Sequence, residues 1–346
     1  MNQPILIVGD PIEGLSFASD SSLALVEGAQ ALGYEVHWAT AHQIALSNGT
    51  AFIQGYELIK EVSKSSAPIT HTVSCTPAQP AEHYQKIFIR KDPPFNESYT
   101  ELCWFLQQTK PGIVVNSPKA LLQHHEKMLP FTLARAGVIP EHCVLPSFVS
   151  ENPDQLTAQA AALFEQASQL TAIVAPKTVS DAVPFKILLK PWRGHGGRGI
   201  QIFNNCDELN RWLRSNFATN NQSHASGQFI LQPFLPEIFT RGDRRVFIVN
   251  GRTVFDFVRR PAPGRIEANL SQGGSATLES MTEEQSKIAD AVAQWLQNEG
   301  LLLAGLDFIG DFLTEVNITS PTGIRTYEQL SKQTVCRDIV SQLLLK

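Results

Sequence analysis

The sequence of 346 residues lacks any long run of Lys and Arg, and its 28 basic residues are outnumbered by 33 acidic ones, giving a formal net charge of −5. Such a balance argues against a surface built to bind nucleic-acid phosphates. The longest uninterrupted apolar segments are about six residues, far short of the roughly 20 needed to cross a bilayer. The first ten residues have no basic start, so we expect no secretory signal.

Cysteine is also scarce. The chain has five cysteines, an odd number, widely spaced and without a C-x-x-C pair, which argues against a disulfide framework and against a structural zinc site. We therefore expect small core or surface thiols in a protein of the reducing cytoplasm. The remaining composition, 43% hydrophobic and 18% charged, is that of an ordinary globular protein. The length suggests about two or three domains.

The first 118 residues read as alternating strands and helices. An apolar run at 5–8 predicts a buried strand, a helical apolar spacing follows between 23 and 32, and 35–39 predicts a second strand. This β-α-β order is typical of a doubly wound, mostly parallel sheet. Further elements are expected in this order: a loop or excursion at 63–80, strands at 86–90 and 113–116, and a domain boundary near Pro118.

A Gly-rich segment, 190–200, lies between two apolar runs. Glycines let backbone amides approach an anion closely. The segment lacks the Gly-Lys-Ser/Thr ending of a P-loop, and a strand rather than a helix follows it. The glycine spacing resembles that of protein kinases, but no HRD or DFG element follows, so a protein kinase is poorly supported. We expect a strand-loop-strand flap over phosphates with Lys190 as a phosphate contact; a plain tight turn and a surface lysine are the alternatives.

Residues 305–317 predict two strands around a Gly-Asp turn. Asp307, Glu315 and Asn317 interrupt otherwise apolar strands, and such oxygen-bearing groups could bridge magnesium to phosphate; the alternative is that they face solvent. A two-residue loop would place Asp307 and Glu315 on opposite faces, whereas a three-residue loop, 310–312, would pair them. We therefore predict the three-residue loop with a G1-type bulge, and the two carboxyl groups within about 6 Å.

Two clusters of cations precede flexible or apolar segments. Arg241–Val246 leads into an apolar strand, and Arg259–Arg265 opens a Gly/Pro-rich segment that ends at Gly274. Cations ahead of a flexible loop suit a lid that clamps phosphates, although Arg241 and Arg260 individually fit solvated surface arginines. A later helix is predicted from the Thr282–Gln285 capping box to Gly300.

Taken in order, these segments resemble prokaryotic glutathione synthetase over essentially the whole chain. The resemblance implies an ATP-grasp fold, in which two α+β lobes hold ATP behind an N-terminal doubly wound α/β domain. It implies three domains: 1–118, 119–233 for the small lobe with the flap, and 234–346 for the large lobe with the lid and metal site. The strings that carry it are Arg90–Phe95, Val115–Pro118, Glu126-Lys127, Leu189–Pro191, Gly242–Val246, Asn269 with Gly273-Gly274, and Gly305–Arg325.

The resemblance also implies roles for individual residues. The nucleotide phosphates would be bound by lysines and flap glycines, adenine by a hinge, and the transferring phosphoryl and acyl groups by Arg245 and Arg259. The expected ATP-binding residues are Lys127, Lys190, Gly196, Gly197, Gln232, Phe234, Leu235 and Asp243. The expected ligands for magnesium, or manganese, are Asp307, Glu315 and Asn317. The expected substrate-binding residues are Asp20, Ser21, Ser22, Asn269, Gly273, Gly274, Ser320, Thr322, Gly323 and Arg325.

The implied activity is an ATP-dependent carboxylate-amine ligase that acts through an acyl phosphate, joining γ-glutamylcysteine to glycine to make glutathione. The resemblance further implies a cytoplasmic homo-oligomer that acts on small molecules and has no nucleic-acid or membrane partner. Two alternatives stay open: an ATP-grasp ligase that makes another small peptide or amide, and a nucleotide-binding regulatory protein without turnover.

Two segments depart from the family pattern. Where the family usually has Glu-x-Arg-Gly-Asn, this chain reads Arg265-Ile266-Glu267-Ala268-Asn269, with acid and base exchanged. We therefore expect Arg265 to take over the charge role usually filled two positions later. Where the family usually has Asp-Gly-Met-Gly-Gly, this chain reads Arg193-Gly194-His195-Gly196-Gly197, and Arg193 could add a phosphate contact.

Overall fold

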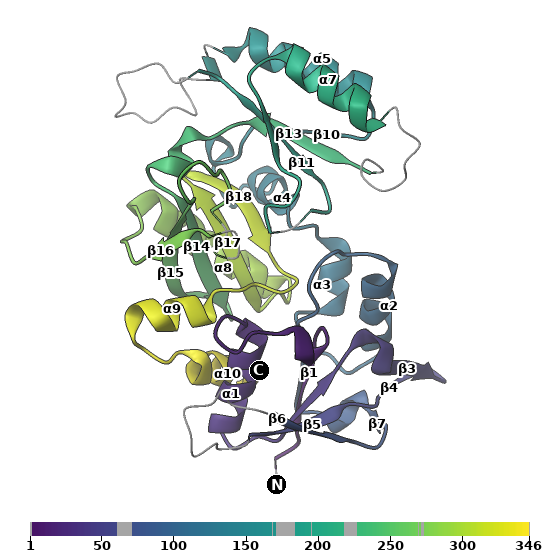
Figure 1. Cartoon of the computed structure of the whole chain (residues 1–346). Coiled ribbons are helices and arrows are strands. Elements are labelled where there is room, and N and C mark those ends of the chain that lie inside the picture. The colour runs from purple at the N-terminus through teal and green to yellow at the C-terminus, as the bar shows by residue number, and fades with distance from the viewer. Residues whose placement is uncertain are drawn as a thin grey trace.

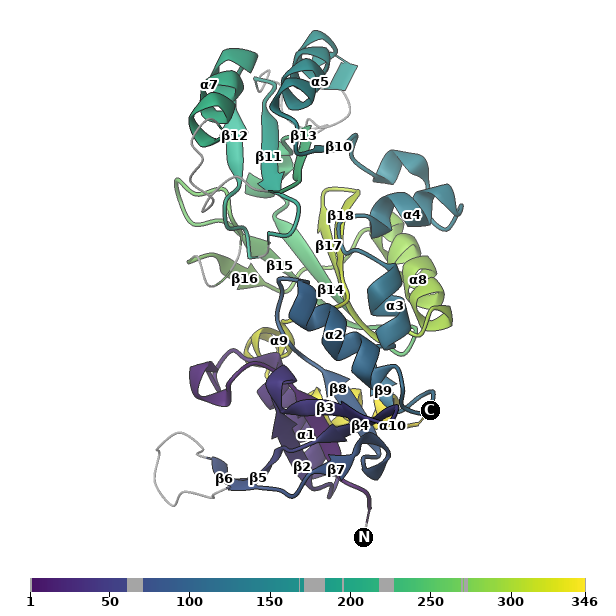
Figure 2. The ribbon, with the colours of Figure 1, turned by 90° about the vertical axis from the view of Figure 1, so that its right-hand side faces the viewer.

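The computed structural model describes residues 2–60, 71–167, 169–170, 184–194, 196–217, 227–268, 270 and 273–345. The strands of these residues form four sheets, and the three larger ones follow one another along the long axis of the molecule in Figures 1 and 2. The sheet of the N-terminal region lies at one end, the sheet that contains β11 at the other, and the sheet that contains β17 between them.

The N-terminal sheet has the order β6-β5-β2-β1-β8-β9. Its strands β2, β1, β8 and β9 are parallel, which confirms the predicted β-α-β start, while β5 and β6 run antiparallel at one edge. A second, three-stranded sheet has the order β3-β4-β7. The strands are β1 (Ile5–Val8), β2 (Val36–Ala39), β3 (Ile44–Ser47), β4 (Thr50–Ile53), β5 (Tyr56–Lys60), β6 (His71–Cys75), β7 (Gln79–Pro80), β8 (Lys86–Ile89) and β9 (Val114–Val115).

Helices cover both faces of the N-terminal sheet. In β1, Ile5 and Ile7 pack with α1 (Ser21–Ala31) and α10 (Cys336–Leu344), while Leu6 and Val8 pack with α2 (Glu97–Leu106) and α3 (Pro118–Gln123). This alternation is the period-two pattern of a strand buried on both faces. The remaining helices of this half are α4 (Leu129–Arg135) and the 3-10 helices η1 (Ile12–Gly14), η2 (Ala41–Gln43) and η3 (Ala81–His83).

The C-terminal helices return to the N-terminal region. Helices α9 (Ile324–Ser331) and α10 lie beside α1 in Figure 1, and Ile339 and Val340 share a core with Leu23 and Val26. Gly28 permits this contact, because a Cβ there would overlap the carbonyl group of Cys336. The domain boundaries stay a prediction, but packing connects the first and last of the three expected domains.

The small-lobe sheet has the order β10-β13-β11-β12 and is antiparallel. Ile187 and Leu189 point to the helices on one face, whereas Leu188 and Lys190 line the cleft on the other. The elements are β10 (Phe148–Ser150), α5 (Pro153–Glu165), β11 (Ile187–Pro191), β12 (Gln201–Phe203), α7 (Cys206–Phe217) and β13 (Phe229–Pro233). The pairing of β11 with β12 confirms the strand-loop-strand arrangement around the Gly-rich segment.

The large-lobe sheet, β16-β15-β14-β17-β18, is also antiparallel. Val246 and Leu306 pack on α8, while Arg245 and Asp307, one position away on the same strands, face the cleft. The elements are η4 (Glu141–Cys143), η5 (Pro236–Phe239), β14 (Asp243–Val249), β15 (Arg252–Arg260), β16 (Ser275–Thr277), α8 (Glu283–Asn298), β17 (Leu303–Ile309) and β18 (Phe312–Asn317). The Thr282–Gln285 capping box is present. No helix in the described ranges is long and apolar enough to cross a membrane.

The β17–β18 hairpin corrects one prediction and confirms another. The loop has two residues, since Ile309 pairs with Phe312, so the predicted three-residue loop is wrong. The register shifts at Thr314, and beyond the shift Asp307 pairs with Glu315 as predicted. Thr314 is the extra residue of a bulge, and its hydroxyl donates to the carbonyl oxygen of Asp307 at 3.0 Å. Gly310 has φ +61°, which suits the tight turn.

Candidate active site

A cleft lies between the open faces of the small-lobe and large-lobe sheets. It has about 1110 Å³ of empty volume, part of it open to solvent. One wall comes from β11, β13 and the Gly-rich segment, and the other from β14, β15, β17 and β18. The cleft brings together Lys127, Lys190, Gly196, Gly197, Gln232, Phe234, Leu235, Asp243, Arg245, Arg259, Asp307, Glu315 and Asn317, so every residue expected to bind ATP or metal, or to act in catalysis, lines it.

Four charged side chains form a continuous array on the large-lobe sheet. Arg245 donates from Nε to Asp307 Oδ1 (2.6 Å) and from Nη2 to Asp307 Oδ2 (3.0 Å). Arg259 lies 3.0 Å from Asp307 Oδ1 and donates to Asp243 Oδ2 at 2.6 Å. The strand register places both pairs directly opposite each other. Gly305 leaves room for the array, because a Cβ there would lie 3.1 Å from Arg245 Cδ.

Burial and charge determine the protonation of these acids. Burial by itself raises the pKa of Asp307, but Arg245 and Arg259 outweigh it and lower the pKa to about 2. Burial raises the pKa of Asp243 to about 6, against the charge of Arg259. Asp307 is therefore a permanent anion at neutral pH, and its negative charge holds two buried arginines in fixed positions.

A second group of charges bridges the two lobes. Lys127 Nζ lies 3.0 Å from Glu315 Oε1 and donates to the carbonyl oxygen of Gly194 at 2.7 Å. Burial opposes ionisation of Glu315, yet Lys127 and Lys190 lower its pKa. Burial lowers the pKa of Lys190, and Glu315 opposes that shift. Two lysines thus face one carboxylate across the cleft, so an anion that approached Glu315 would meet both cations.

The Gly-rich flap packs against the segment that carries Lys127. The rings of Trp192 and His125 stack with centroids 4.1 Å apart and planes 3° from parallel. Burial, with help from Lys127, lowers the pKa of His125 to about 4, so its ring is neutral at pH 7. Gly196 and Gly197 have positive φ values of +63° and +75°, a backbone that glycine adopts without strain. The expected role of Arg193 in contacting phosphate stays a prediction.

The far end of the cleft is apolar. Phe234, Ile238 and Ala268 form a small buried cluster with Leu188 beside it. The expected hinge starts there, with Gln232 donating from Nε2 to Ser147 Oγ at 2.6 Å. The backbone N–H of Phe234 donates to the carbonyl oxygen of Lys186 at 2.9 Å and is therefore not free to bind a ligand. An apolar slot beside polar groups suits a flat heteroaromatic ring.

The lid segment that departs from the family pattern, 265–269, has its described residues at this apolar end. Ile266, Glu267 and Ala268 line the cleft, while Arg265 is exposed and does not line it. The side chain that reaches the site is thus the acid, contrary to the expectation for Arg265.

We expect Glu267→Ala to raise the KM of one substrate by about tenfold, because a charge-assisted hydrogen bond of about 1.5 kcal/mol would be lost. Arg265→Ala should change KM by less than about twofold, since exposed substitutions cost little. Steady-state KM values for ATP and for the acid substrate test both variants. Equal effects of the two substitutions would contradict this placement of the segment.

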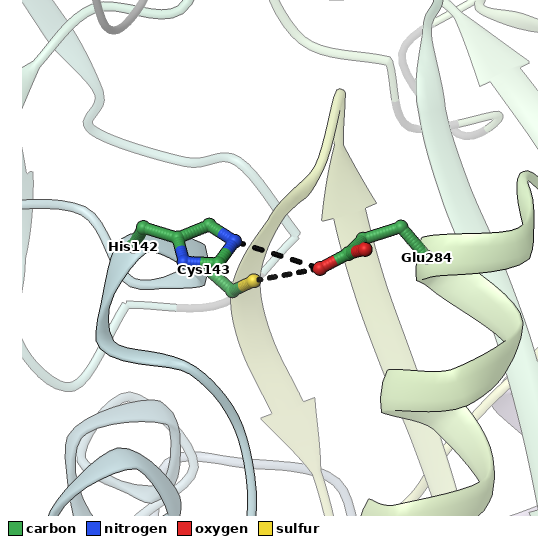
Figure 3. A group of neighbouring side chains, drawn as sticks. All are labelled: His142, Cys143 and Glu284. Carbon is green, nitrogen blue, oxygen red and sulfur yellow. Dashed lines mark hydrogen bonds and ion pairs between the residues drawn. The ribbon is translucent and has the colours of Figure 1, made fainter.

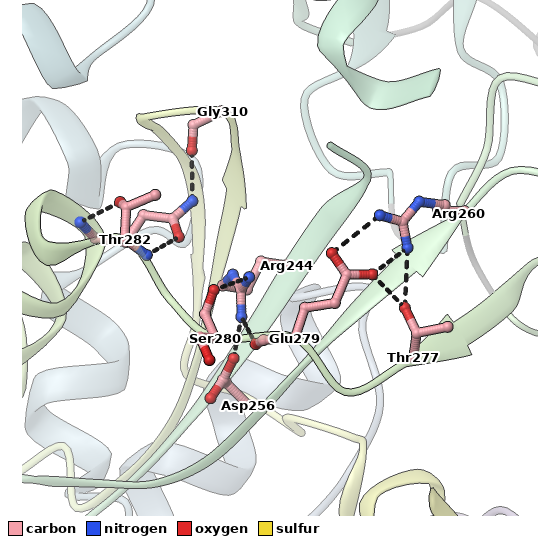
Figure 4. A network of polar contacts seen from close by, with 9 residues as sticks. Arg244, Asp256, Arg260, Thr277, Glu279, Ser280, Thr282 and Gly310 are labelled. Carbon is pink, nitrogen blue, oxygen red and sulfur yellow. Dashed lines mark hydrogen bonds and ion pairs between the residues drawn. The ribbon is translucent and has the colours of Figure 1, made fainter. Parts of the chain in front are cut away.

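A polar network lies where β15 ends and β16 begins, at the base of the expected lid, 261–274 (Figure 4). Arg260 donates from Nη1 to Glu279 Oε1 (2.5 Å) and from Nη2 to Glu279 Oε2 (3.1 Å). Arg244 binds Asp256 and donates to the carbonyl oxygens of Glu279 (2.7 Å) and Ser280 (3.0 Å). Arg260 is thus paired, and so is the other expected surface arginine, Arg241, which binds Asp311 at 3.0 Å.

Glu279→Gln should loosen the lid base and let water reach a reactive intermediate. We expect the ratio of phosphate released to amide formed to rise about twofold to fivefold, the range that corresponds to an ion pair worth up to about 1 kcal/mol. Phosphate and product are measured in the same reaction. The control is Glu283→Gln, which removes the exposed pair with Lys287 on α8. If the ratio stayed constant, the pair would have no part in closing the lid.

The residues expected to form the peptide-substrate walls gather near the start of α1 rather than in the cleft. Asp20 caps α1 by accepting from Leu23 N at 2.8 Å. Ser21 Oγ accepts from the N–H groups of Gly323 (3.0 Å) and Ile324 (3.3 Å). Thr322 connects this region to the charged array, because its carbonyl oxygen accepts from Arg245 Nη1 at 2.8 Å.

The other expected substrate residues are placed less directly. Ser320 donates to the carbonyl oxygen of Arg90 at 3.3 Å, and Arg325 is held between Glu27 and Glu328. Gly273 and Gly274 form the end of the expected lid and do not line the cleft, and Asn269 lies outside the described residues. Ser22 is buried and accepts from Arg90 Nε at 3.1 Å.

The sequence interpretation assigned no role to two charged residues near the site, the buried Arg90 and the half-buried Glu126. Arg90 is 3% exposed, donates from Nη2 to the carbonyl oxygen of Pro321 at 2.9 Å, and has an Nη1 without a hydrogen-bond partner in the described structure. Glu126 Oε1 accepts from the backbone N–H groups of Ile318 and Thr319, beside Lys127. Their positions in the sequence could have pointed to them, because Arg90 follows a predicted buried strand and Glu126 precedes a lysine of the expected site.

Asp307, Glu315 and Asn317 fit a hard divalent cation. Their register places all three on the cleft face of the hairpin. Both carboxylates have lowered pKa values. Asn317 donates a hydrogen bond from Nδ2 to Asp307 Oδ2 at 3.0 Å, which leaves its amide oxygen as a metal ligand. Carboxylate and amide oxygens are the donors that magnesium and similar ions prefer.

Known structures with this architecture identify the class. The D-cycloserine synthetase DcsG is 13% identical and aligns with a TM-score of 0.64 over 98% of both chains. The macrocyclase MdnC of Microcystis aeruginosa is 11% identical, with a TM-score of 0.60 over 99% of both chains. These similarities show a shared fold. The ATP-grasp domain that matches residues 163–332 gives this fold its name, because it covers both lobes around the charged cleft.

The sequence comparisons identify the family. The chain belongs to the prokaryotic glutathione synthetase family: the N-terminal domain of that family matches residues 4–121 and its ATP-grasp domain matches residues 163–332. Glutathione synthetase of Pseudomonas aeruginosa is 31% identical over 328 residues, covering 93% of this chain and 92% of the relative. The enzyme of Escherichia coli O127:H6 is 32% identical over 325 residues, with coverage of 93% and 92%. The family places the chain among ATP-dependent C–N ligases.

Proposed function

We propose that this protein is a glutathione synthetase, which joins γ-glutamylcysteine to glycine with conversion of ATP to ADP and phosphate. The observation that carries the proposal is the meeting of lysines from one lobe with the arginine-acid array of the other in a single cleft. Family membership supports the same conclusion. A nucleotide-binding protein without turnover would have little use for both the array and the oxygen donor set.

In the first proposed step, a substrate carboxylate oxygen attacks the γ-phosphorus of ATP and ADP leaves. A carboxylate is a poor acyl donor because its leaving group would be oxide, and this step converts it into an acyl phosphate. Lys127 and Lys190 stand on the side of the small lobe and Arg245 on the side of the large lobe, so cations surround the transferring group. Mg²⁺, or Mn²⁺ in its place, held by Asp307, Glu315 and Asn317, would neutralise charge on that group.

In the second step, the amine nitrogen of glycine attacks the acyl carbon, phosphate leaves, and the amine loses a proton. Arg259 is positioned to stabilise the oxyanion, because Asp243 and Asp307 hold its guanidinium in place. The pKa of Arg259 is raised: burial alone would lower it, but the two acids more than compensate. The lid excludes water, which would otherwise hydrolyse the acyl phosphate.

The dipeptide is proposed to bind where the order of strands in the N-terminal sheet reverses, at β1. Strand β1 lies between β2 and β8, and ligands of open α/β sheets bind at the carboxyl ends of strands at such a point. Arg90 follows β8 there, and the unpartnered Nη1 of its buried guanidinium suits a substrate carboxylate. The start of α1 and the segment 320–325 would form the walls on either side.

Phosphate release with γ-glutamylcysteine plus glycine, compared with a panel of other acids and amines, tests the proposal. We expect the stated pair to give the highest kcat/KM and to require a divalent metal. A higher value for another pair would indicate a ligase for a different small peptide or amide, and release that never depends on an amine would contradict ligation. We further propose a homo-oligomeric state, which size-exclusion chromatography of the purified protein tests, and a cytoplasmic location, which cell fractionation tests.

A further inference from the structure

A histidine, a cysteine and a glutamate from distant parts of the chain meet outside the cleft. His142 and Cys143 belong to η4, in the connection between α4 and β10, and Glu284 lies in the first turn of α8 (Figure 3). None of the three lines the proposed active site. Cys143 and Glu284 are 141 positions apart, so spacing in the sequence gives no sign of the cluster.

The three side chains direct their ligand atoms toward one another. Cys143 Sγ lies 3.9 Å from Glu284 Oε1, His142 Nε2 lies 3.5 Å from the same oxygen, and all the ligand atoms are within 4.8 Å of one another. In a tetrahedral zinc site, ligand atoms at their usual bond lengths are about 3.3–3.6 Å apart. The cluster needs shifts of about 1 Å to reach that geometry, which rotation of the exposed His142 and Glu284 side chains can supply.

The charges around the cluster favour a cation. Glu284 has His142 as its ion-pair partner, with no Lys or Arg paired to it among the described residues. Asp311 adds negative charge on the side of Cys143. Sulfur and nitrogen donors distinguish this group from Asp307, Glu315 and Asn317, which offer oxygen alone, so the two groups select different metals.

We propose that His142, Cys143 and Glu284 form a second metal site, which takes a thiolate-binding divalent cation such as Zn²⁺ and leaves a fourth position to water. On binding, the Cys143 thiol loses its proton to solvent and the sulfur–metal bond forms. The ion would join the connection before β10 to the start of α8. Because η4 also packs on β18, the metal would fix the small-lobe connection against the sheet that carries the active site.

Cobalt(II) titration of the metal-free, full-length protein in excess Mg²⁺ tests this site. Co²⁺ bound to a thiolate has a near-ultraviolet charge-transfer band that oxygen ligands do not produce, so binding at Asp307 and Glu315 would not be mistaken for it. We expect the band to saturate at one equivalent, Zn²⁺ to displace it, and Cys143→Ser to abolish it. Cys75→Ser, which removes an exposed thiol elsewhere, is the matched control and should keep the band.

His142→Ala provides a second test that does not disturb the core, because its side chain is 72% exposed. We expect it to weaken Co²⁺ binding by at least about tenfold and to leave basal turnover unchanged. Absence of the band in the wild type would overturn the proposal. Persistence of the band in Cys143→Ser, or unchanged Co²⁺ affinity in His142→Ala, would also overturn it, and none of these results would bear on the ligase reaction.

Discussion

Lys190→Met is expected to lower turnover by at least about 100-fold, the usual cost of removing a preorganised group that stabilises developing charge. Lys190 lies near the end of β11 on the cleft face, where its ammonium group and that of Lys127 lower the pKa of Glu315. Methionine keeps the length of the aliphatic stem, so the substitution removes the charge without opening a cavity. Since burial lowers the pKa of Lys190, the charged ammonium is costly to keep, and a phosphate would repay that cost.

Single-turnover formation of ADP measures the step that Lys190 should affect. Circular dichroism and the thermal unfolding midpoint should match the wild type, since the strand and its neighbours stay intact. The control is Lys119→Met, on the exposed side of α3, which should retain full activity. Turnover of Lys190→Met within about twofold of the wild-type value would contradict its assignment to the phosphate site.

Apolar runs in the sequence predicted several strands, including β1, β2, β8 and β11, but not β6 and β7, which lie in the segment 63–80 that was expected to be a loop or an excursion. In β11 and β14, residues that face the helices alternate with residues that face the cleft, as Leu189 and Lys190 show. The same reasoning paired Asp307 with Glu315. It placed the extra residue in the loop, whereas the structure places it at Thr314, because parity requires one additional residue but does not specify its position.

Contacts between distant segments could not be predicted from local pattern. The hydrogen bond from Arg245 to the carbonyl oxygen of Thr322 joins residues 77 positions apart. The hydrogen bond from Arg90 to the carbonyl oxygen of Pro321 depends on how the last third of the chain returns to the first. The expectation that Arg265 faces the site, which came from the exchange of acid and base in the lid, was wrong for a similar reason. Glu267 lines the cleft and Arg265 is exposed, and Ala268 beside them packs against Phe234, more than 30 residues away in the sequence.

Asp307→Asn should affect both activity and stability. Removing this carboxylate takes away one of the oxygen donors and leaves Arg245 and Arg259, both buried, without their shared anion. Breaking a buried ion pair from one side costs about 3–5 kcal/mol in the free energy of unfolding. Because the pKa of Asp307 is lowered to about 2, its stabilising contribution is present at neutral pH and lost as pH falls from 3.8 toward 2. The variant should lack that part of the acid dependence.

Asp256→Asn is the matched control, since Asp256 binds Arg244 on the opposite face of the same pair of strands. Both variants should lower the free energy of unfolding measured with urea. Their responses to metal and nucleotide should differ: Mg²⁺ with ADP should raise the unfolding midpoint of the wild type and of Asp256→Asn, but not that of Asp307→Asn. If all three proteins gained the same stability from Mg²⁺ with ADP, Asp307 would be a structural partner of the two arginines and would not bind the metal, and the proposed donor set would have to exclude it.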